Sequence, residues 1–351
     1  MLSTNPANGA THVAVSTVGP GNVVTPRTVS AVFSEAMNPA SIVSPALTFT
    51  LKERLSGNNV AGTVTMNAAG TVATLTPAAV LASNTQFIAT ITSAATSVAG
   101  IALAYRVEWS FTTGSHVGQA PVDLATAASF LVLAGTSIDN ISSQANPTRI
   151  NGQLGIWPGL ASSVHGFTES TPAGTGIILT GGIQTGDIVR QAQDDLLAAK
   201  NDAGTRSSFQ VAVGTQDLSQ LAFDGGAPGV YPPGLYVSGS SLALIAGNMV
   251  LDARGDPDAV WIFRAGSSLT VADSRKLFLI NGARAANVFW DLGSSATVGD
   301  QVDFKGSIMS ATSNTVGTGT ATSTGTAVEG RVLAHSTSVV LNFTTVNAPA
   351  P

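Results

Sequence analysis

The sequence offers few side chains that could catalyse a reaction or hold a metal ion, and its densest group of carboxylates lies in one short stretch. "LDARGDPDAV" carries Asp252, Asp256 and Asp258, and residues 254–256 spell Arg-Gly-Asp. Carboxylate oxygens at this spacing could bind calcium, and an Arg-Gly-Asp loop could be read by an integrin-type receptor. The other interpretation is a tight corner, in which Asp accepts hydrogen bonds from turn amides and Pro257 fixes the bend. We favour the corner.

Catalytic motifs are missing. The four histidines, His12, His116, His165 and His335, are scattered and lack the short spacing of metal ligands. Cysteine is absent, which removes thiolate nucleophiles and disulfides. Gly-x-Ser-x-Gly, His-Glu-x-x-His, P-loop and complete Gly-x-Gly-x-x-Gly motifs are also absent. We therefore expect no enzymatic activity, no cofactor and no metal site.

Serine and threonine, in contrast, recur with a regular alternation. "GSSLTV" (266–271) is repeated as "GSSATV" (293–298), and "FLVLAGTSI" (130–138) is echoed by "GSIMSATSNTV" (306–316) and "GRVLAHSTSV" (330–339). Because side chains alternate along a strand, Leu269 and Val271 should point inward and the hydroxyl residues between them outward. Repeated units of this kind are typical of a β-solenoid.

Composition limits the partners. Only 10% of the 351 residues are charged, and the net charge is −5, against about 25% charged residues in a typical domain. No basic run is present, so we expect no nucleic-acid partner. No segment approaches the ~18 apolar residues of a membrane helix, so we expect no membrane insertion. The N-terminus lacks the regions of a signal peptide, and we expect a secreted or cell-surface monomer whose signal peptide lies outside this sequence.

Two domains are predicted. Residues 1–116 contain short alternating strands such as "TVSAVF" (28–33) and a hairpin that turns at residues 67–70, which indicates a β-sandwich. Residues 117–351 hold the repeats and one predicted helix, with Asp187 as its N-cap and Gly204 at its end. The stripe expected on the buried side of this helix comprises Ile188, Ala192, Leu196 and Ala199. No composition signal links the two cores, so we expect residues 118–351 to fold alone.

Both parts resemble known families. "VSAVFSEAMNPASI" and "LTPAAVLASNTQFIATI" closely resemble bacterial Ig-like domains, which act as spacers or adhesion modules. "VDLATAASFLVLAGTSIDN", "QAQDDLLAAKNDA", "YPPGLYVSGSSLAL" and "NGARAANVFWDLGSSATVGD" resemble the β-helical ice-binding (antifreeze) proteins of polar bacteria, fungi and diatoms. This second resemblance implies a discontinuous β-helix of triangular cross-section with one long helix along a side. It also implies adsorption to ice, with thermal hysteresis and inhibition of ice recrystallisation. The run "SNTVGTGTATSTGT" (313–326) is longer than the family pattern.

Ice would be contacted through outward-facing residues of the short strands. Threonine suits such a face because it presents a hydroxyl and a methyl on a stiff stem, and stacked strands repeat every ~4.8 Å, close to repeats of the ice lattice. The residues expected on the face are Ser137, Ser268, Thr270, Ser295, Thr297, Thr315, Thr318, Thr320, Ser338 and Val340.

Two other functions remain open. One is a β-helical carbohydrate-active enzyme, which would need paired carboxylates in a groove. The other is a carbohydrate-binding surface protein or adhesin. The aromatic residues Trp261, Phe263, Phe289 and Trp290 alternate within strands, and we expect them in the core rather than stacked on sugar.

Overall fold

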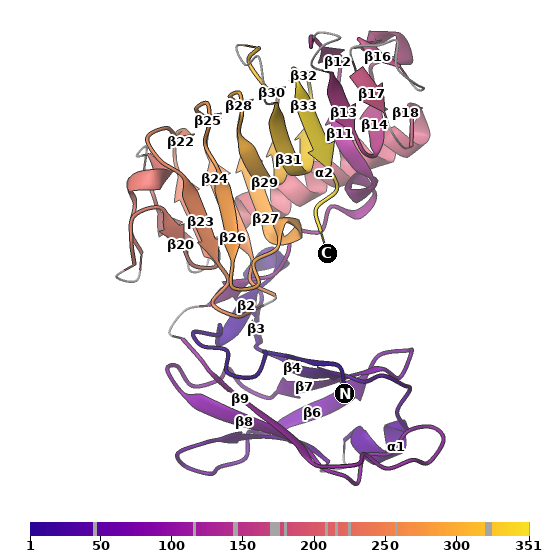
Figure 1. Ribbon diagram of the computed structural model, residues 1–351, viewed down its shortest axis with the longest axis vertical. Coiled ribbons are helices and arrows are strands. Elements are labelled where there is room, and N and C mark those ends of the chain that lie inside the picture. The colour runs from indigo at the N-terminus through magenta and orange to yellow at the C-terminus, as the bar shows by residue number, and fades with distance from the viewer. Residues whose placement is uncertain are drawn as a thin grey trace.

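The computed structural model describes residues 1–44, 48–114, 117–142, 147–168, 176–178, 181–207, 210–214, 217–223, 226–256, 258–319 and 325–350. Within these residues the protein is mostly β, with few helices, and it divides into a smaller N-terminal part and a larger C-terminal part (Figure 1).

The N-terminal part consists of two antiparallel sheets around one apolar core. Alternation explains the packing: Val29, Ala31 and Phe33 all point inward and are buried, as predicted. The predicted hairpin at residues 67–70 is also confirmed, since it joins two paired strands. In the first described sheet the strand order is β1 (Ser3–Asn5), β4 (Val29–Val32), β7 (Val72–Pro77) and β6 (Gly62–Met66). In the second it is β5 (Phe49–Glu53), β8 (Gln86–Ile91) and β9 (Val107–Thr112). The short helix α1 (Pro39–Ile42) lies beside them.

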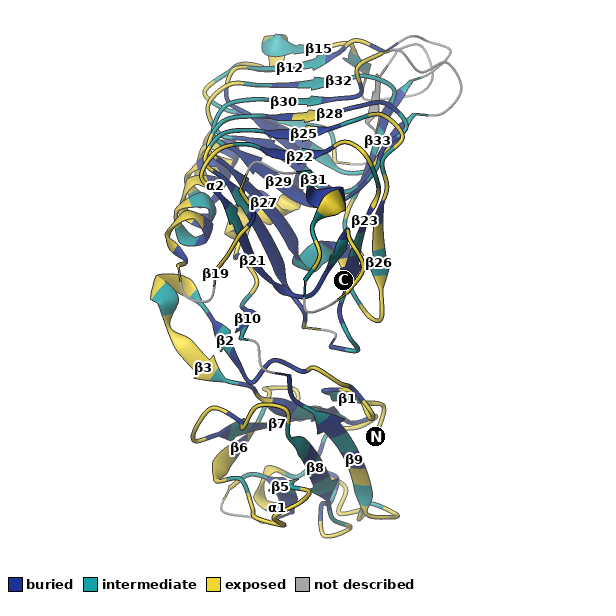
Figure 2. Ribbon diagram, turned by 90° about the vertical axis from the view of Figure 1, so that its left-hand side faces the viewer, coloured by how far each residue is buried: buried dark blue, intermediate teal, exposed yellow. Residues whose placement is uncertain are grey.

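A small sheet lies between the two parts (Figures 1 and 2). It joins β2 (Ser16–Val18) to β3 (Val24–Pro26), and β10 (Gly118–Gln119) pairs in parallel with β2. The turn between β2 and β3, η1 (Pro20–Asn22), reaches the C-terminal part. There the Asn22 side chain donates to Thr205 O (3.2 Å) and accepts from Ser207 N (2.8 Å). The two parts are therefore joined by more than a linker.

The C-terminal part winds through three sets of parallel strands. Three consecutive strands belong to three different sheets: β24 (Trp261–Ala265), β25 (Leu269–Val271) and β26 (Leu277–Ile280). The next strand, β27 (Val288–Leu292), then stacks on β24. The partners Leu242, Leu269 and Ala296 are each 27 residues apart, and the next partner, Asn314, follows after 18. This shorter coil explains why the sequence spacing is irregular.

The described strands of the C-terminal part lie in three parallel sheets. A 13-stranded sheet of the described chain contains β16 (Phe167–Thr168), β17 (Gly176–Ile178), β13 (Thr148–Ile150), β33 (Thr344–Asn347), β31 (Thr326–Ala334), β29 (Asp303–Ser310), β27 (Val288–Leu292), β24 (Trp261–Ala265), β21 (Gly234–Ser238) and β19 (Gln210–Ala212), with β11 (Phe130–Ala134), β14 (Gln153–Ile156) and β18 (Ile183–Gln184) branching from β31. A seven-stranded sheet contains β15 (Val164–His165), β12 (Ser137–Asn140), β32 (Ser338–Leu341), β30 (Asn314–Val316), β28 (Ala296–Val298), β25 (Leu269–Val271) and β22 (Leu242–Leu244), and a three-stranded sheet contains β20 (Val230–Tyr231), β23 (Met249–Asp252) and β26 (Leu277–Ile280). The short helices η2 (Ala125–Ser129), η3 (Ala161–Ser163), η4 (Leu218–Gln220) and η5 (Ala285–Asn287) connect them.

The one long helix, α2 (Asp187–Thr205), packs along the outside of the 13-stranded sheet. Ala192, Leu196 and Ala199 are buried, as predicted, but Ile188 is 57% exposed, and Val189 takes its place. The helix also begins one residue earlier than predicted, because Gly186, and not Asp187, is the N-cap. Lys200 fixes the helix to the sheet, since its Nζ donates to Asp291 Oδ1 (2.7 Å), Leu292 O (2.9 Å) and Met309 O (2.9 Å).

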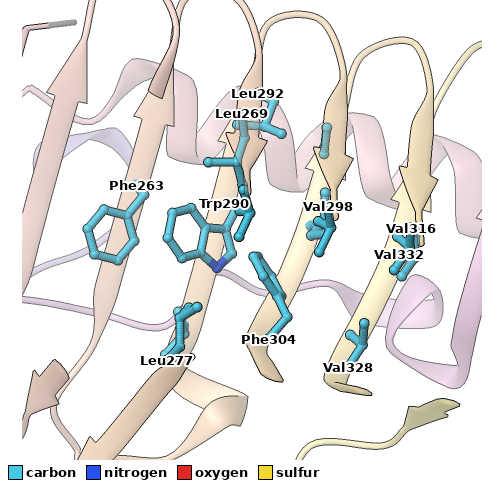
Figure 3. Close-up of a cluster of buried hydrophobic side chains, with 14 of the residues drawn as sticks. Phe263, Leu269, Leu277, Trp290, Leu292, Val298, Phe304, Val316, Val328 and Val332 are labelled. Atoms are coloured by element: carbon cyan, nitrogen blue, oxygen red, sulfur yellow. The ribbon is translucent and has the colours of Figure 1, made fainter. Parts of the chain in front are cut away.

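The interior of the coils is filled by aliphatic and aromatic side chains (Figure 3). Phe263 stacks on Trp290 with ring centroids 4.3 Å apart, and Trp290 contacts Phe304 at 5.3 Å. Trp261 and Phe289 are also buried. The prediction that these aromatic residues belong to the core is confirmed.

Candidate functional site

The seven-stranded sheet gathers most of the residues predicted from alternation. Figure 2 shows its strands lying one above another with little twist. Six of the ten predicted residues lie in these strands, and Ser268 and Ser295 directly precede β25 and β28. The inward positions are confirmed as well, because Leu269, Val271 and Val298 are buried.

The strand register aligns one outward residue from each strand into a straight row. Thr270, Thr297 and Thr315 are direct partners across β25, β28 and β30. Thr270 in β25 and Thr297 in β28 are exposed, and Thr315 in β30 is half-buried. We call the full row the threonine rank, and it comprises Ala243, Thr270, Thr297, Thr315, Val340, Asp139 and His165.

A second row lies two positions earlier on each strand. Backbone ladder bonds fix its register, since Leu242 N donates to Ser268 O (2.8 Å), Leu269 N to Ser295 O (2.9 Å) and Ala296 N to Ser313 O (3.1 Å). Neighbouring hydroxyls can bond along the row, as at Ser241 Oγ and Ser268 Oγ, 3.1 Å apart. We call this the serine rank, and it comprises Ser241, Ser268, Ser295, Ser313, Ser338 and Ser137. The two ranks together form the hydroxyl face.

Glycines set the approach of neighbouring coils beside this face. A Cβ atom on Gly293 would lie 2.4 Å from Gly266 O, and a Cβ atom on Gly266 would lie 2.4 Å from Gly239 O. Both distances are far below van der Waals contact, so only glycine permits this spacing. These glycines thereby keep the rows of hydroxyls at the regular strand repeat of ~4.8 Å.

Two predicted residues are not placed on the sheet. Thr318 follows the turn at Gly317, whose φ is 78°, and its side chain donates to Asp300 Oδ2 (3.1 Å) while its amide donates to Asp300 Oδ1 (2.7 Å). The threonine is therefore part of a corner held by Asp300, and its assignment to the face was wrong. Thr320 lies outside the described residues.

The prediction also missed members of both ranks. Ser241 and Ala243 belong to "GSSLAL" (239–244), which repeats "GSSLTV" 27 residues earlier, so the repeat itself contained the signal. Ser313 was missed because its coil is shorter than the others, so it does not recur at the 27-residue spacing. Asp139 and His165 were not expected on the sheet, and they close the threonine rank with a contact of 2.7 Å between His165 Nδ1 and Asp139 Oδ1.

The Asp-rich loop is a structural corner, as favoured. Asp256 is 5% exposed and its Oδ1 lies 2.7 Å from Arg27 Nη2 and accepts from Asp258 N at 3.0 Å. A carboxylate so enclosed is not accessible to a receptor. Pro257, which was expected to fix the bend, and His116 lie outside the described residues. Within the described residues, no three His, Cys, Asp or Glu side chains are grouped to hold a metal ion. No described helix has the length and apolar character needed to cross a membrane.

Comparison with known proteins extends these observations. A protein of Nostoc sp. (strain HG1), named an ice-binding protein, is 37% identical over 199 residues, which cover 56% of this chain and 64% of that protein. An ice-binding protein of Leucosporidium sp. (strain AY30) is 30% identical over 65% of this chain and 84% of its own length. The crystal structure of an ice-binding protein from an Antarctic biological consortium is similar with a TM-score of 0.56 and 35% identity, covering 66% of this chain and 93% of that one.

Family profiles divide the chain in the same way as the structure. A bacterial Ig-like domain profile matches residues 1–113. The profile described as ice-binding-like matches residues 132–347, which include every strand of the seven-stranded sheet. The chain therefore belongs to the ice-binding-like family, with a bacterial Ig-like domain at its N-terminus.

Proposed function

We propose that this protein adsorbs to ice through the hydroxyl face. The observation that carries the proposal is the direct register of Thr270, Thr297 and Thr315 beside a continuous serine rank. Such a surface presents hydroxyls and methyls at a fixed spacing that the backbone sets, so little side-chain entropy is lost on contact.

The chemistry of the face suits a neutral crystal of water. From β22 to β32, the two ranks contain only serine, threonine, alanine and valine. Charged groups are strongly hydrated and would have to lose that water on contact, at a cost in free energy. Asp139 and His165 lie at one end of the threonine rank, where they leave the centre of the face free.

The winding through three sets of strands supports a discontinuous β-helix of triangular cross-section, with the hydroxyl face as one side. We propose that residues 117–351 form this ice-binding domain and residues 1–116 form the Ig-like domain. The resemblance of the family members further supports a secreted or cell-surface monomer without enzymatic activity, which slows ice growth and recrystallisation. No observation on the hydroxyl face favours a carbohydrate-active enzyme.

The test is adsorption to ice by the purified full chain. Slow growth of an ice hemisphere from a micromolar solution should enrich the protein in the ice, whereas a control protein of similar size stays in the liquid. Thermal hysteresis and inhibition of recrystallisation should accompany the enrichment. Exclusion from the ice together with no effect on crystal growth would refute the proposal.

A further inference from the structure

A cleft of about 580 Å³ lies where the N-terminal part meets the coils. We call it the junction cleft. Its lining includes Thr17, Thr25, Thr28 and Gln119 on one side and Asp258 and Arg284 on the other. Binding sites for small molecules usually have volumes of roughly 300–1,000 Å³. The junction cleft has this size and is separate from the hydroxyl face.

The wall of the cleft contains polar groups that the described residues do not satisfy. Gln119 is 1% exposed, and neither its amide oxygen nor its amide nitrogen has a hydrogen-bond partner. The Nε of Arg27 is likewise buried without a partner. Buried polar groups are nearly always hydrogen-bonded in folded proteins, because an unmet donor or acceptor destabilises the structure. These atoms call for a ligand with both donors and acceptors.

Charge narrows the ligand class. Arg27 is already paired, since its Nη2 lies 2.7 Å from Asp256 and 3.5 Å from Asp258. Arg284 is exposed and has no ion pair among the described residues. A guanidinium in this situation favours a carboxylate, which can accept two parallel N–H bonds.

We propose that the junction cleft binds a small hydroxylated carboxylate of the sugar-acid class. The carboxylate accepts hydrogen bonds from Arg284, which supplies the charge. The hydroxyl groups exchange hydrogen bonds with the Gln119 amide and with the threonine hydroxyls, because each of these groups can donate and accept. Pro26 and Pro121 also line the cleft and offer apolar contact to the C–H groups of the ligand. This site is independent of adsorption to ice.

The experiment is an NMR titration of the isotopically labelled full chain with sodium D-glucuronate. D-glucose and sodium sulfate serve as comparison ligands at constant ionic strength. Backbone amides around Gln119 and its side-chain amide should shift saturably with glucuronate, and glucose and sulfate should each bind at least tenfold more weakly. Arg284→Gln should reduce the affinity for glucuronate at least fivefold. Arg149→Gln, which changes an exposed arginine in β13 outside the cleft lining, should not.

Each alternative result would overturn the proposal. Without a saturable shift at the cleft, glucuronate does not bind there and the cleft holds water only. Equal affinity for sulfate would make it a general anion site, and equal affinity for glucose would remove the role of the charge. Unchanged affinity in Arg284→Gln would move the binding site elsewhere. Because Arg284 is exposed, this variant should fold, and its melting temperature provides the check.

Discussion

Arg27 Nη2 and Asp256 Oδ1 lie 2.7 Å apart across the junction between the two parts of the chain, and both side chains are almost completely buried. Burial raises the pKa of Asp256, and the positive charge of Arg27 opposes that rise. The pair shows that the two cores are linked, which sequence composition did not reveal. The expectation that residues 118–351 fold independently rested on the absence of such a link, so we now expect that fragment to be less stable than the full chain.

Arg27→Met should destabilise the protein strongly. The substitution leaves Asp256 buried without its counter-charge, and breaking a buried pair in this way costs about 3–5 kcal/mol. Calorimetric unfolding of the full chain would measure the change. Arg106→Met is the control, because Arg106 pairs with Glu108 at an exposed site, where ion pairs contribute about 0–1 kcal/mol. Equal effects of the two variants would contradict the proposed role of the buried pair.

Thr297→Tyr should abolish most of the thermal hysteresis without unfolding the protein. The residue is exposed in the threonine rank between Thr270 and Thr315, so a ring there would hold its neighbours away from a flat crystal. An exposed substitution changes stability by no more than about 0.5 kcal/mol. Osmometry and a melting curve on the same sample would separate lost contact from unfolding.

The matched control for this variant is Ala327→Tyr. Ala327 is an exposed strand residue that pairs with Asp303 and Thr345 in the 13-stranded sheet. Its replacement adds the same ring outside the hydroxyl face and should leave activity unchanged. Full hysteresis in Thr297→Tyr, or an equal loss in Ala327→Tyr, would show that another surface contacts ice.

Gly293→Ala should disturb the spacing of the coils. The new methyl group would lie 2.4 Å from Gly266 O, a backbone atom that cannot move alone. We expect a loss of about 1–3 kcal/mol, as for other overpacked sites, and reduced hysteresis. Gly239→Ala changes the end of the same column, where nothing lies within 4 Å of the added atom, and it should be neutral in both measurements. Similar melting temperatures for the two variants would exclude this steric role.

Asp217→Asn should lower the free energy of unfolding at neutral pH, because it removes a carboxylate at the end of the seven-stranded sheet. Burial alone would raise the pKa of Asp217, but hydrogen bonds from the amides of Ser219, Ala246 and Ile245 hold it below its ordinary value of 3.8. A lowered pKa in the folded state stabilises the protein above pH 3.8, and this contribution disappears as the pH falls through the folded-state pKa. Unfolding at pH 7 should cost roughly 1–2 kcal/mol less in the variant. The difference should shrink as the pH falls through the folded-state pKa of Asp217, and a difference that stays constant with pH would contradict the mechanism.

Most of the correct predictions about the hydroxyl face came from the alternation of inward and outward side chains along the strands. In "GSSLTV" and "GSSATV" the small corner residue, the hydroxyls and the inward aliphatics follow one another in a fixed order, so Thr270 and Thr297 could be assigned to the outside. The same rule placed Trp290 and Phe263 in the core, where they stack.

Two wrong assignments, those of Thr318 and Ile188, have physical causes that a pattern of alternating or periodic residues cannot reveal. Thr318 has the right side chain, but Asp300 accepts hydrogen bonds from its amide and hydroxyl and so draws the chain into a corner. Ile188 has the right spacing for the helix stripe, yet the chain enters α2 at Gly186, and the sheet covers Val189 instead. Both outcomes depend on tertiary contacts between distant residues.

The position of β12 has a consequence for the order in which the protein can assemble. Most strands of the seven-stranded sheet pair with one that lies at most 27 residues away, as Leu269 does with Leu242, so these coils can form as the chain emerges from the ribosome. Strand β12 instead pairs with β32 through Ser137 and Ser338. The earliest coil must therefore stay unpaired on that edge until the last one has been synthesised. Such non-local pairing slows folding, and a chain terminated before residue 338 would expose two unpaired strand edges to other molecules.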